Sequence, residues 1–169
     1  RVLMQHKDSF KGTVKLLFQP AEEVPPGGAQ AMIKDGALEE PKVDAAFGLH
    51  VASDMPAGQI GWRSGPGSAG SDRFRAVIKG KGGHAARPHT SVDPVVIAAQ
   101  VIVALQSLVA RETDPMDSAV VSTTAVLAGE AFNVIPDSAE LRGTVRTIDP
   151  ETRERMEKRV QEVITGIAS

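Results

Sequence analysis

The sequence predicts an α/β protein in two parts: a portion of a parallel-sheet domain, followed by a smaller α+β domain of the ferredoxin-like kind. Two observations support this division. From residue 1 to about residue 71, short apolar runs typical of buried strands alternate with loops rich in Gly and Pro. From residue 72 to residue 169, strand-like stretches with alternating apolar and polar residues are separated by two long helical patterns. The predicted domains are therefore 1–71 and 72–169.

Two strands and one helix are predicted in the first part. The segments 14–18 and 45–49 are apolar runs with the length of buried strands, and 29–34 is a short helical run between them. A strand-helix-strand unit normally belongs to a parallel sheet, whose functional loops follow the carboxyl ends of the strands. We therefore expect residues 19–23 and His50 at the same edge of the sheet.

The second part begins with a strand and a helix. Phe74, Ala76 and Ile78 alternate with polar residues, which is typical of a strand with one buried face. Asp93 is placed to cap a helix that has Pro94 at its first position and continues to about residue 111. The length of this segment favours a helix over a strand. Because few of its residues are polar, we expect most of its surface to be covered.

Two antiparallel strands and a second helix follow. The alternating stretches 119–127 and 139–148 are separated by a loop that contains Gly and Pro. After residue 149, apolar residues recur at steps of three and four among charged neighbours, which predicts an amphipathic helix. The order matches a split βαβ, ferredoxin-like unit that ends before its last strand. We expect both ends of the chain to be cut ends of a longer protein.

Composition and charge narrow the classes of function. The chain has 169 residues, a net charge of -2, 4% aromatic residues and no Cys. Without an excess of cations or many aromatic rings, we expect no nucleic-acid partner. The most apolar stretch, 95–110, contains polar residues and is shorter than the roughly 18–20 apolar residues of a bilayer span, so we expect no membrane association. The lack of Cys fits a reducing, cytoplasmic location.

Two carboxylates and an imidazole are candidates for a metal site. Glu22 and Glu23 come just after the first predicted strand, and adjacent side chains of an extended segment point in opposite directions. One can then bind a metal ion while the other addresses bound water. His50 ends the second predicted strand, and imidazole is a favoured zinc ligand. The alternatives are a solvated Glu pair in a loop and an ordinary hydrogen-bonded His.

Two later segments also carry polar candidates. The segment 82–89 combines small residues with His84, Arg87 and His89, which offer donors to a carboxylate or an oxyanion. A plain strand-to-helix turn explains the same residues. In the segment 132–137, Asn133 is the candidate, and the alternative is a loop in which its side chain bonds its own backbone. The Gly-rich residues 61–70 lack the spacing and the Lys of a phosphate-binding loop, so we interpret them as a hinge.

Taken together, these segments resemble the metallopeptidase family that contains aminoacylases and carboxypeptidase G. Within it, the chain is most similar to the amidohydrolase subgroup of hippurate hydrolases, N-acetyl-diaminopimelate deacetylases and indole-acetyl-amino-acid hydrolases. The resemblance covers essentially the whole chain. It rests on six motifs in order: FQPAEE at 18–23, GGAxAMIxDGAL at 27–38, GLHV at 48–51, GKGGHAARPH at 80–89, FNVIPD at 132–137 and GTVRT at 143–147.

The resemblance implies that the first part belongs to a catalytic domain. Glu22 is then the general base, Glu23 a metal ligand and His50 a second ligand in a site for two divalent ions, which can be zinc, manganese, cobalt or nickel. The family's upstream His/Cys motif and its downstream His ligand have no counterpart in this sequence. We therefore expect the 169-residue chain to be inactive on its own.

The resemblance implies that the second part is a lid and dimerisation domain. His84 then acts in catalysis and Asn133 contacts the substrate, with Arg87 and His89 as further contacts. A homodimer through residues 95–127 is expected, because the strand 119–127 lies at a sheet edge in a ferredoxin-like order and an unpaired edge is a template for another strand.

The implied function is hydrolysis of the amide bond of N-acyl amino acids, such as hippurate-like or N-acetyl substrates, by metal-activated water. Two alternatives stay open. One is a dipeptidase or carboxypeptidase of the same family. The other is a non-catalytic dimerisation or ligand-sensing module, which has no reason to carry Glu22, Glu23 and His50 at one sheet edge.

Overall fold

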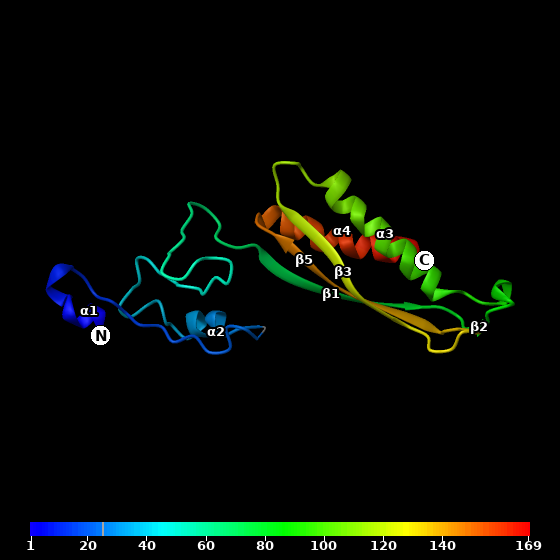
Figure 1. The fold of residues 1–169 in the computed structure, drawn as a ribbon, viewed down its shortest axis with the longest axis horizontal. Coiled ribbons are helices and arrows are strands. Elements are labelled where there is room, and N and C mark those ends of the chain that lie inside the picture. The colour runs from blue at the N-terminus through cyan, green and yellow to red at the C-terminus, as the bar shows by residue number, and fades with distance from the viewer. Residues whose placement is uncertain (25) are drawn as a thin grey trace. The chain divides into compact units, whose positions relative to one another are not determined.

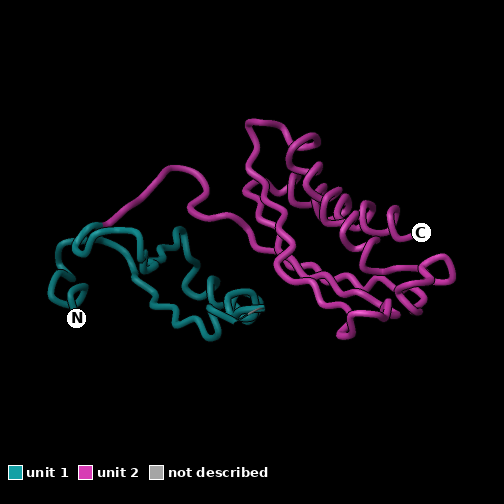
Figure 2. Tube along the Cα trace, turned by 45° about the vertical axis from the view of Figure 1, so that its right-hand side comes forward, with its two compact units in different colours: residues 1–59 teal, residues 60–169 magenta. Residues whose placement is uncertain are grey.

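The computed structural model describes residues 1–24 and 26–169, which fall into two compact units. Residues 1–59 form the first unit and residues 60–169 the second (Figure 2). The first long strand begins at residue 70, so most of the predicted hinge, 61–70, belongs to the second unit without regular structure. The roles assigned to 1–71 and 72–169 stay predictions.

The first unit contains little regular structure. Its elements are α1 (Val2–Gln5), the 3-10 turn η1 (Lys7–Ser9) and α2 (Ala29–Lys34), and α2 is the predicted helix. The predicted strands 14–18 and 45–49 are wrong, because neither segment is paired in a ladder.

The physical reason is that a strand needs a neighbour to accept and donate its backbone hydrogen bonds. The side chains of Phe18, Phe47 and Leu49 are 83%, 98% and 88% exposed, so the apolar runs have no surface to pack against within the described residues. The parallel sheet predicted for the first part is therefore not found there, and the sheets of the second unit are antiparallel.

The second unit is built on a three-stranded antiparallel sheet. Its strands are β1 (Gly70–Lys79), β3 (Ala119–Ala128) and β5 (Ser138–Thr147), in the order β1-β5-β3 (Figure 1). This confirms the antiparallel strands of the second part and places β3 at an edge. A separate small ladder joins β2 (Gly83–His84) to β4 (Val134–Ile135).

Both predicted helices of the second unit are present. They are α3 (Pro94–Glu112) and α4 (Pro150–Ala168). The carboxylate of Asp93 accepts the backbone N–H of Val95 at 2.9 Å, and Asp149 caps α4 in the same way. A side chain that accepts an otherwise unpaired N–H of the first turn typically contributes about 1 kcal/mol.

The core of the second unit lies between one face of the sheet and the two helices. Leu105 and Leu108 of α3, Leu141 of β5 and Met156 of α4 are fully buried in it. Truncating such a side chain to Ala typically costs about 2–5 kcal/mol. This core supplies the packing that stabilises the second unit.

One side of α3 stays uncovered. Val96 and Val103 are 53% and 73% exposed, so the expectation that most of this helix is covered is wrong for the described residues. In the part of the chain that the structure describes, α3 is also the one helix long and apolar enough to cross a membrane. The length argument against a span therefore does not hold, although a core helix of a soluble protein meets the same criteria. Here its other side packs on the sheet.

A carboxylate stabilises the face of the sheet away from the helices. Arg75 of β1 and Arg142 of β5 are register partners. Glu140 accepts a hydrogen bond of 2.6 Å from each of them, which offsets the repulsion between the two guanidinium groups. These hydrogen bonds, from Arg75 first and Arg142 second, lower the pKa of Glu140 from its ordinary 4.5 to about 2.

Candidate functional site

Three candidate residues of the first unit lie together. Glu22, Glu23 and His50 each place one possible ligand atom within 4.8 Å of the other two. The Glu pair lies in a turn and His50 in an unpaired segment far along the chain, so the folding of residues 1–59 brings them together. All three residues are exposed, and an ion or a water molecule from solvent has access to them.

The turn that carries the Glu pair has an unusual backbone. Ala21 has a φ of 51°, and it is the one non-Gly residue with positive φ within residues 1–24 and 26–169. This left-handed conformation costs an L-residue about 1–2 kcal/mol. The Val24 N–H donates to the Ala21 carbonyl at 3.3 Å and closes the turn. Strain of this kind is often found at functional sites, and here it lies in the residue directly before Glu22 and Glu23.

The surroundings of His50 select one tautomer. Its Nδ1 lies 2.7 Å from the backbone carbonyl oxygen of Val51. A carbonyl oxygen only accepts, so Nδ1 carries the hydrogen and donates it, and Nε2 of the neutral ring keeps a free lone pair. Metal-binding histidines are commonly held in this way by a carbonyl behind the ring. Two carboxylates and such an imidazole therefore form a donor set that suits zinc and related divalent ions.

In the second unit, His84 lies on the short β2–β4 ladder. It is the register partner of Val134, and the next residue, Ala85, donates its N–H to the carbonyl of Asn133 at 2.9 Å. The Nδ1 of His84 accepts the backbone N–H of Ala86 at 3.1 Å. The hydrogen of the neutral ring is therefore on Nε2, which is a donor on an exposed residue.

The other predicted contact residues flank this ladder. Asn133 precedes β4, Arg87 precedes the 3-10 turn η2 (Pro88–Thr90), and His89 lies within η2. The Arg87 N–H donates to the His84 carbonyl at 2.8 Å, which folds the turn back toward β2. Within the described residues no hydrogen bond of the Asn133 side chain is found, so the alternative of a bond to its own backbone is not seen. Contact of these residues with substrate stays a prediction.

Asp137 is a residue to which the sequence argument gives no role. It accepts the N–H of Gly82 at 2.9 Å on Oδ1, two residues before His84. The available signal was an Asp that follows Pro in the motif at 132–137, since Asp side chains commonly accept backbone N–H groups near turns.

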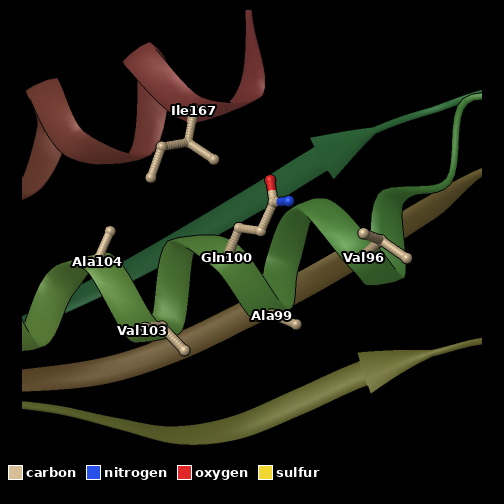
Figure 3. Close-up of a pocket in the computed structure, with 6 residues that line it drawn as sticks. All are labelled: Val96, Ala99, Gln100, Val103, Ala104 and Ile167. Carbon is tan, nitrogen blue, oxygen red and sulfur yellow. The ribbon is translucent and has the colours of Figure 1, made fainter.

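An open hollow in the second unit does not involve these residues. Its volume is 590 Å³, and it is lined along α3 by Val96, Ala99, Gln100, Val103 and Ala104, and by Ile167 of α4 (Figure 3). Its lining has no acid, base or metal ligand. The hollow therefore marks an uncovered apolar surface rather than a place for chemistry.

Comparison with known proteins identifies the family. A family model described as peptidase family M20/M25/M40 matches residues 1–166. The chain belongs to this family. The resemblance found from the six motifs is thereby confirmed.

The M20 chain is also similar to named hydrolases. It is 48% identical over 169 residues to an IAA-amino acid hydrolase of Arabidopsis thaliana, covering 100% of this chain and 38% of the relative. It is 47% identical over 168 residues to the N-acetylcysteine deacetylase of Bacillus subtilis, covering 99% of this chain and 43% of the relative. The M20 chain thus spans less than half the length of these relatives.

The chain is also similar to a solved structure of the M20 family. A Bacillus subtilis protein described as a dinuclear metal binding peptidase of the M20 family matches with a TM-score of 0.72 and 42% identity, over 99% of this chain and 40% of that one. The mixed helix and sheet architecture of the M20 chain is therefore that of its family.

Proposed function

We propose that this chain carries part of the active site of an M20 amidohydrolase that cleaves the amide bond of N-acyl amino acids. The observation that carries the proposal is the cluster of Glu22, Glu23 and His50, which brings a base and two ligand types to one place. The relatives support the bond type, because one is named for hydrolysis of an IAA-amino acid and another for deacetylation of N-acetylcysteine.

The donor set defines which residues would hold the ions. Glu23 and His50, through its Nε2, would be ligands for one or two divalent ions, and zinc, manganese, cobalt and nickel all accept these atoms. Such an ion supplies a positive charge that polarises the scissile carbonyl and makes water more acidic. The solved Bacillus subtilis relative, described as dinuclear, supports a site for two ions.

Side chains of this chain would move the protons and stabilise the charge during the reaction. Glu22 takes a proton from the attacking water on a carboxylate oxygen and passes it to the departing amine nitrogen. His84 donates its Nε2 hydrogen to the carbonyl oxygen as negative charge develops there, which its tautomer allows. Asn133 would contact the substrate carboxylate or the scissile carbonyl, and Arg87 and His89 would be further contacts with the substrate.

Two substitutions in the full-length protein test the division of roles. Glu22→Gln keeps the metal content but loses most of the turnover, since an amide cannot accept the proton of water. Glu23→Ala lowers metal content, measured by elemental analysis after gel filtration. Near-normal turnover of Glu22→Gln, or loss of metal from both variants, contradicts the assigned roles.

The described chain by itself should bind zinc weakly and lack amidase activity. Glu23 and His50 are two ligands, whereas a catalytic zinc usually takes three from protein. Calorimetric titration of the 169-residue chain measures the affinity. Sub-micromolar stoichiometric binding that is lost in His50→Ala would mean that the site is more complete than proposed.

Activity assays on several substrate classes separate the alternative functions. A panel of benzoyl-amino acids, acetyl-amino acids and dipeptides measures kcat/KM for each bond type. A higher kcat/KM on dipeptides than on N-acyl amino acids would favour the dipeptidase or carboxypeptidase alternative over the amidohydrolase. Absence of turnover on every substrate by metal-loaded full-length protein would favour the ligand-sensing module.

We further propose that the full-length protein is a homodimer through residues 95–127. Support comes from the edge position of β3, which leaves backbone groups for a second strand, and from the exposed Val96 and Val103 of α3 beside the apolar hollow. Such a dimer would cover both features at once.

If His84 serves the partner's site, two inactive variants should complement each other. Mixed Glu22→Gln and His84→Ala subunits give about half heterodimers, each with one intact site, so about a quarter of the wild-type activity is expected for independent sites. Recovery of no activity after verified subunit exchange would place His84 in its own subunit's site or outside catalysis.

A further inference from the structure

We propose that Asp137 is a positioning residue that holds the backbone before His84, so that the Nε2–H of His84 points in one fixed direction. This inference rests on the function proposed for His84. Its basis is a clamp with two hydrogen bonds. Asp137 accepts the N–H of Gly82 on its side-chain Oδ1 at 2.9 Å and the N–H of Gly80 on its backbone carbonyl at 2.8 Å.

The clamp acts where the ladder itself is weak. β2 and β4 have two residues each, so they offer few backbone hydrogen bonds to hold His84 in place. Pro136 has no N–H to extend the ladder toward Asp137. The carboxylate of Asp137 supplies the acceptor that the N–H of Gly82 needs at this point.

The clamped segment lies close to its neighbours in the structure. A side chain on any of its glycines would meet backbone or polar atoms at distances that real Cβ atoms do not show. A Cβ at Gly80 would lie 2.3 Å from the Val92 carbonyl oxygen, and one at Gly83 would lie 2.5 Å from Ser91 Oγ. The glycines of this motif therefore allow the close approach of the segment to its neighbours.

The clamp is linked to the ring of His84 through the next turn. Ala85 donates to the Asn133 carbonyl, and Ala86 donates to Nδ1 of His84. Because Gly82 lies only two residues before His84, a shift of the backbone at Gly82 changes the position of the ring. A displacement of about 1 Å in a catalytic group can cost on the order of a hundredfold in rate.

The test uses kinetics of the full-length enzyme on its preferred N-acyl amino acid. Asp137→Ala removes the Oδ1 acceptor and should lower kcat about 10- to 100-fold with little change in KM, because the donor acts on the transition state. Asp137→Asn keeps an acceptor at Oδ1 and should recover most of the rate. Glu130→Ala, which removes a charge from the same loop region without touching this clamp, is the matched control.

A double variant separates positioning from a general structural effect. In the His84→Ala background, Asp137→Ala should change kcat by less than about twofold, since its effect passes through His84. Amide hydrogen exchange of the segment 80–86 should rise in Asp137→Ala and stay low in Asp137→Asn. If Asp137→Ala does not give folded protein by circular dichroism, Asp137→Ser takes its place.

Different results would contradict the role proposed for His84 and the role proposed for Asp137. If His84→Ala retains wild-type kcat, the role proposed for His84 is wrong and this inference falls with it. If His84→Ala is impaired, three results overturn the inference alone: wild-type kcat in Asp137→Ala, an Asp137→Asn variant as slow as Asp137→Ala, or an undiminished effect of Asp137→Ala in the His84→Ala background.

Discussion

The glycine in the middle of the central strand offers a sharp test of the fold. Gly143 of β5 is the register partner of Phe74 of β1. A Cβ at residue 143 would lie 2.2 Å from two ring carbons of Phe74 and 2.4 Å from the carbonyl oxygen of Ser122 in β3. Since carbon atoms in contact are normally about 3.5–4.0 Å apart, Gly143→Ala requires both the ring and the edge strand to move.

The atoms around Gly143 indicate how much Gly143→Ala should lower the free energy of unfolding. Overpacking a core typically costs about 1–3 kcal/mol, and the upper end applies because one obstacle is backbone rather than a side-chain tip. Ala recovers about 0.5–1 kcal/mol that Gly loses in a strand, so the net cost is about 2 kcal/mol. With a typical urea m-value of about 1.5 kcal/mol/M, the unfolding midpoint should fall by about 1.3 M.

Far-UV circular dichroism of the chain in urea measures this change, because both long helices, α3 and α4, belong to the second unit. Gly166→Ala is the matched control, since Gly166 is an exposed position of α4 where a Cβ meets nothing within 4 Å, and the substitution should stabilise by up to about 1 kcal/mol. In a Phe74→Ala background the cost of Gly143→Ala should shrink. A Gly143→Ala variant as stable as the wild type would refute the packing of the ring over Gly143.

Two further predictions concern single carboxylates. Because the pKa of Glu140 is lowered to about 2 in the folded chain, its contribution to stability is present above its ordinary value of 4.5 and is lost as the pH falls from 4.5 toward 2. The slope of stability against pH in that window, from urea midpoints, should be smaller in Glu140→Gln, and an unchanged slope would contradict this. Asp93→Ala should cost about 1 kcal/mol by losing the N-cap of α3, whereas Asp93→Asn should cost little, and equal losses in both would show that the cap bond is not the cause.

The elements of the second unit could be predicted because their signals are local. An Asp-Pro pair marks the start of each long helix, and each Asp caps its helix in the structure. Alternation of apolar and polar residues predicted β1, β3 and β5 for the same reason, since period two decides which face of a strand is buried.

The prediction of strands at 14–18 and 45–49 failed because neither segment is paired in the described residues, and a local pattern cannot show this. Phe18 and Phe47 show that a segment is apolar enough to be buried, but burial depends on what lies beside it. A parallel strand has neighbours far away in sequence, so its apolar run carries no information on whether they are present. The helix α2 was predicted in the same region because its hydrogen bonds lie within six residues.

The candidate site also has parts that local sequence patterns predict and parts that they do not. Residue types and motifs identified Glu22, Glu23 and His50, and the fold of the first unit does bring them together. The left-handed Ala21 and the clamp by Asp137 could not be predicted, because each depends on a backbone path that no local pattern specifies. Both features lie beside candidate site residues: Ala21 directly precedes Glu22, and Asp137 bonds Gly82, two residues before His84.

The two histidines show how the backbone can assign different chemistry to one residue type. His50 faces a carbonyl oxygen, which requires a hydrogen on Nδ1 and leaves Nε2 as a lone-pair donor suited to a cation. His84 faces the N–H of Ala86, which requires a lone pair on Nδ1 and leaves Nε2 as a hydrogen donor suited to a developing oxyanion. The tautomer that each backbone contact selects is therefore the one that the proposed role of that ring requires, and the two carboxylates beside His50 add the second reason to propose it as the metal ligand.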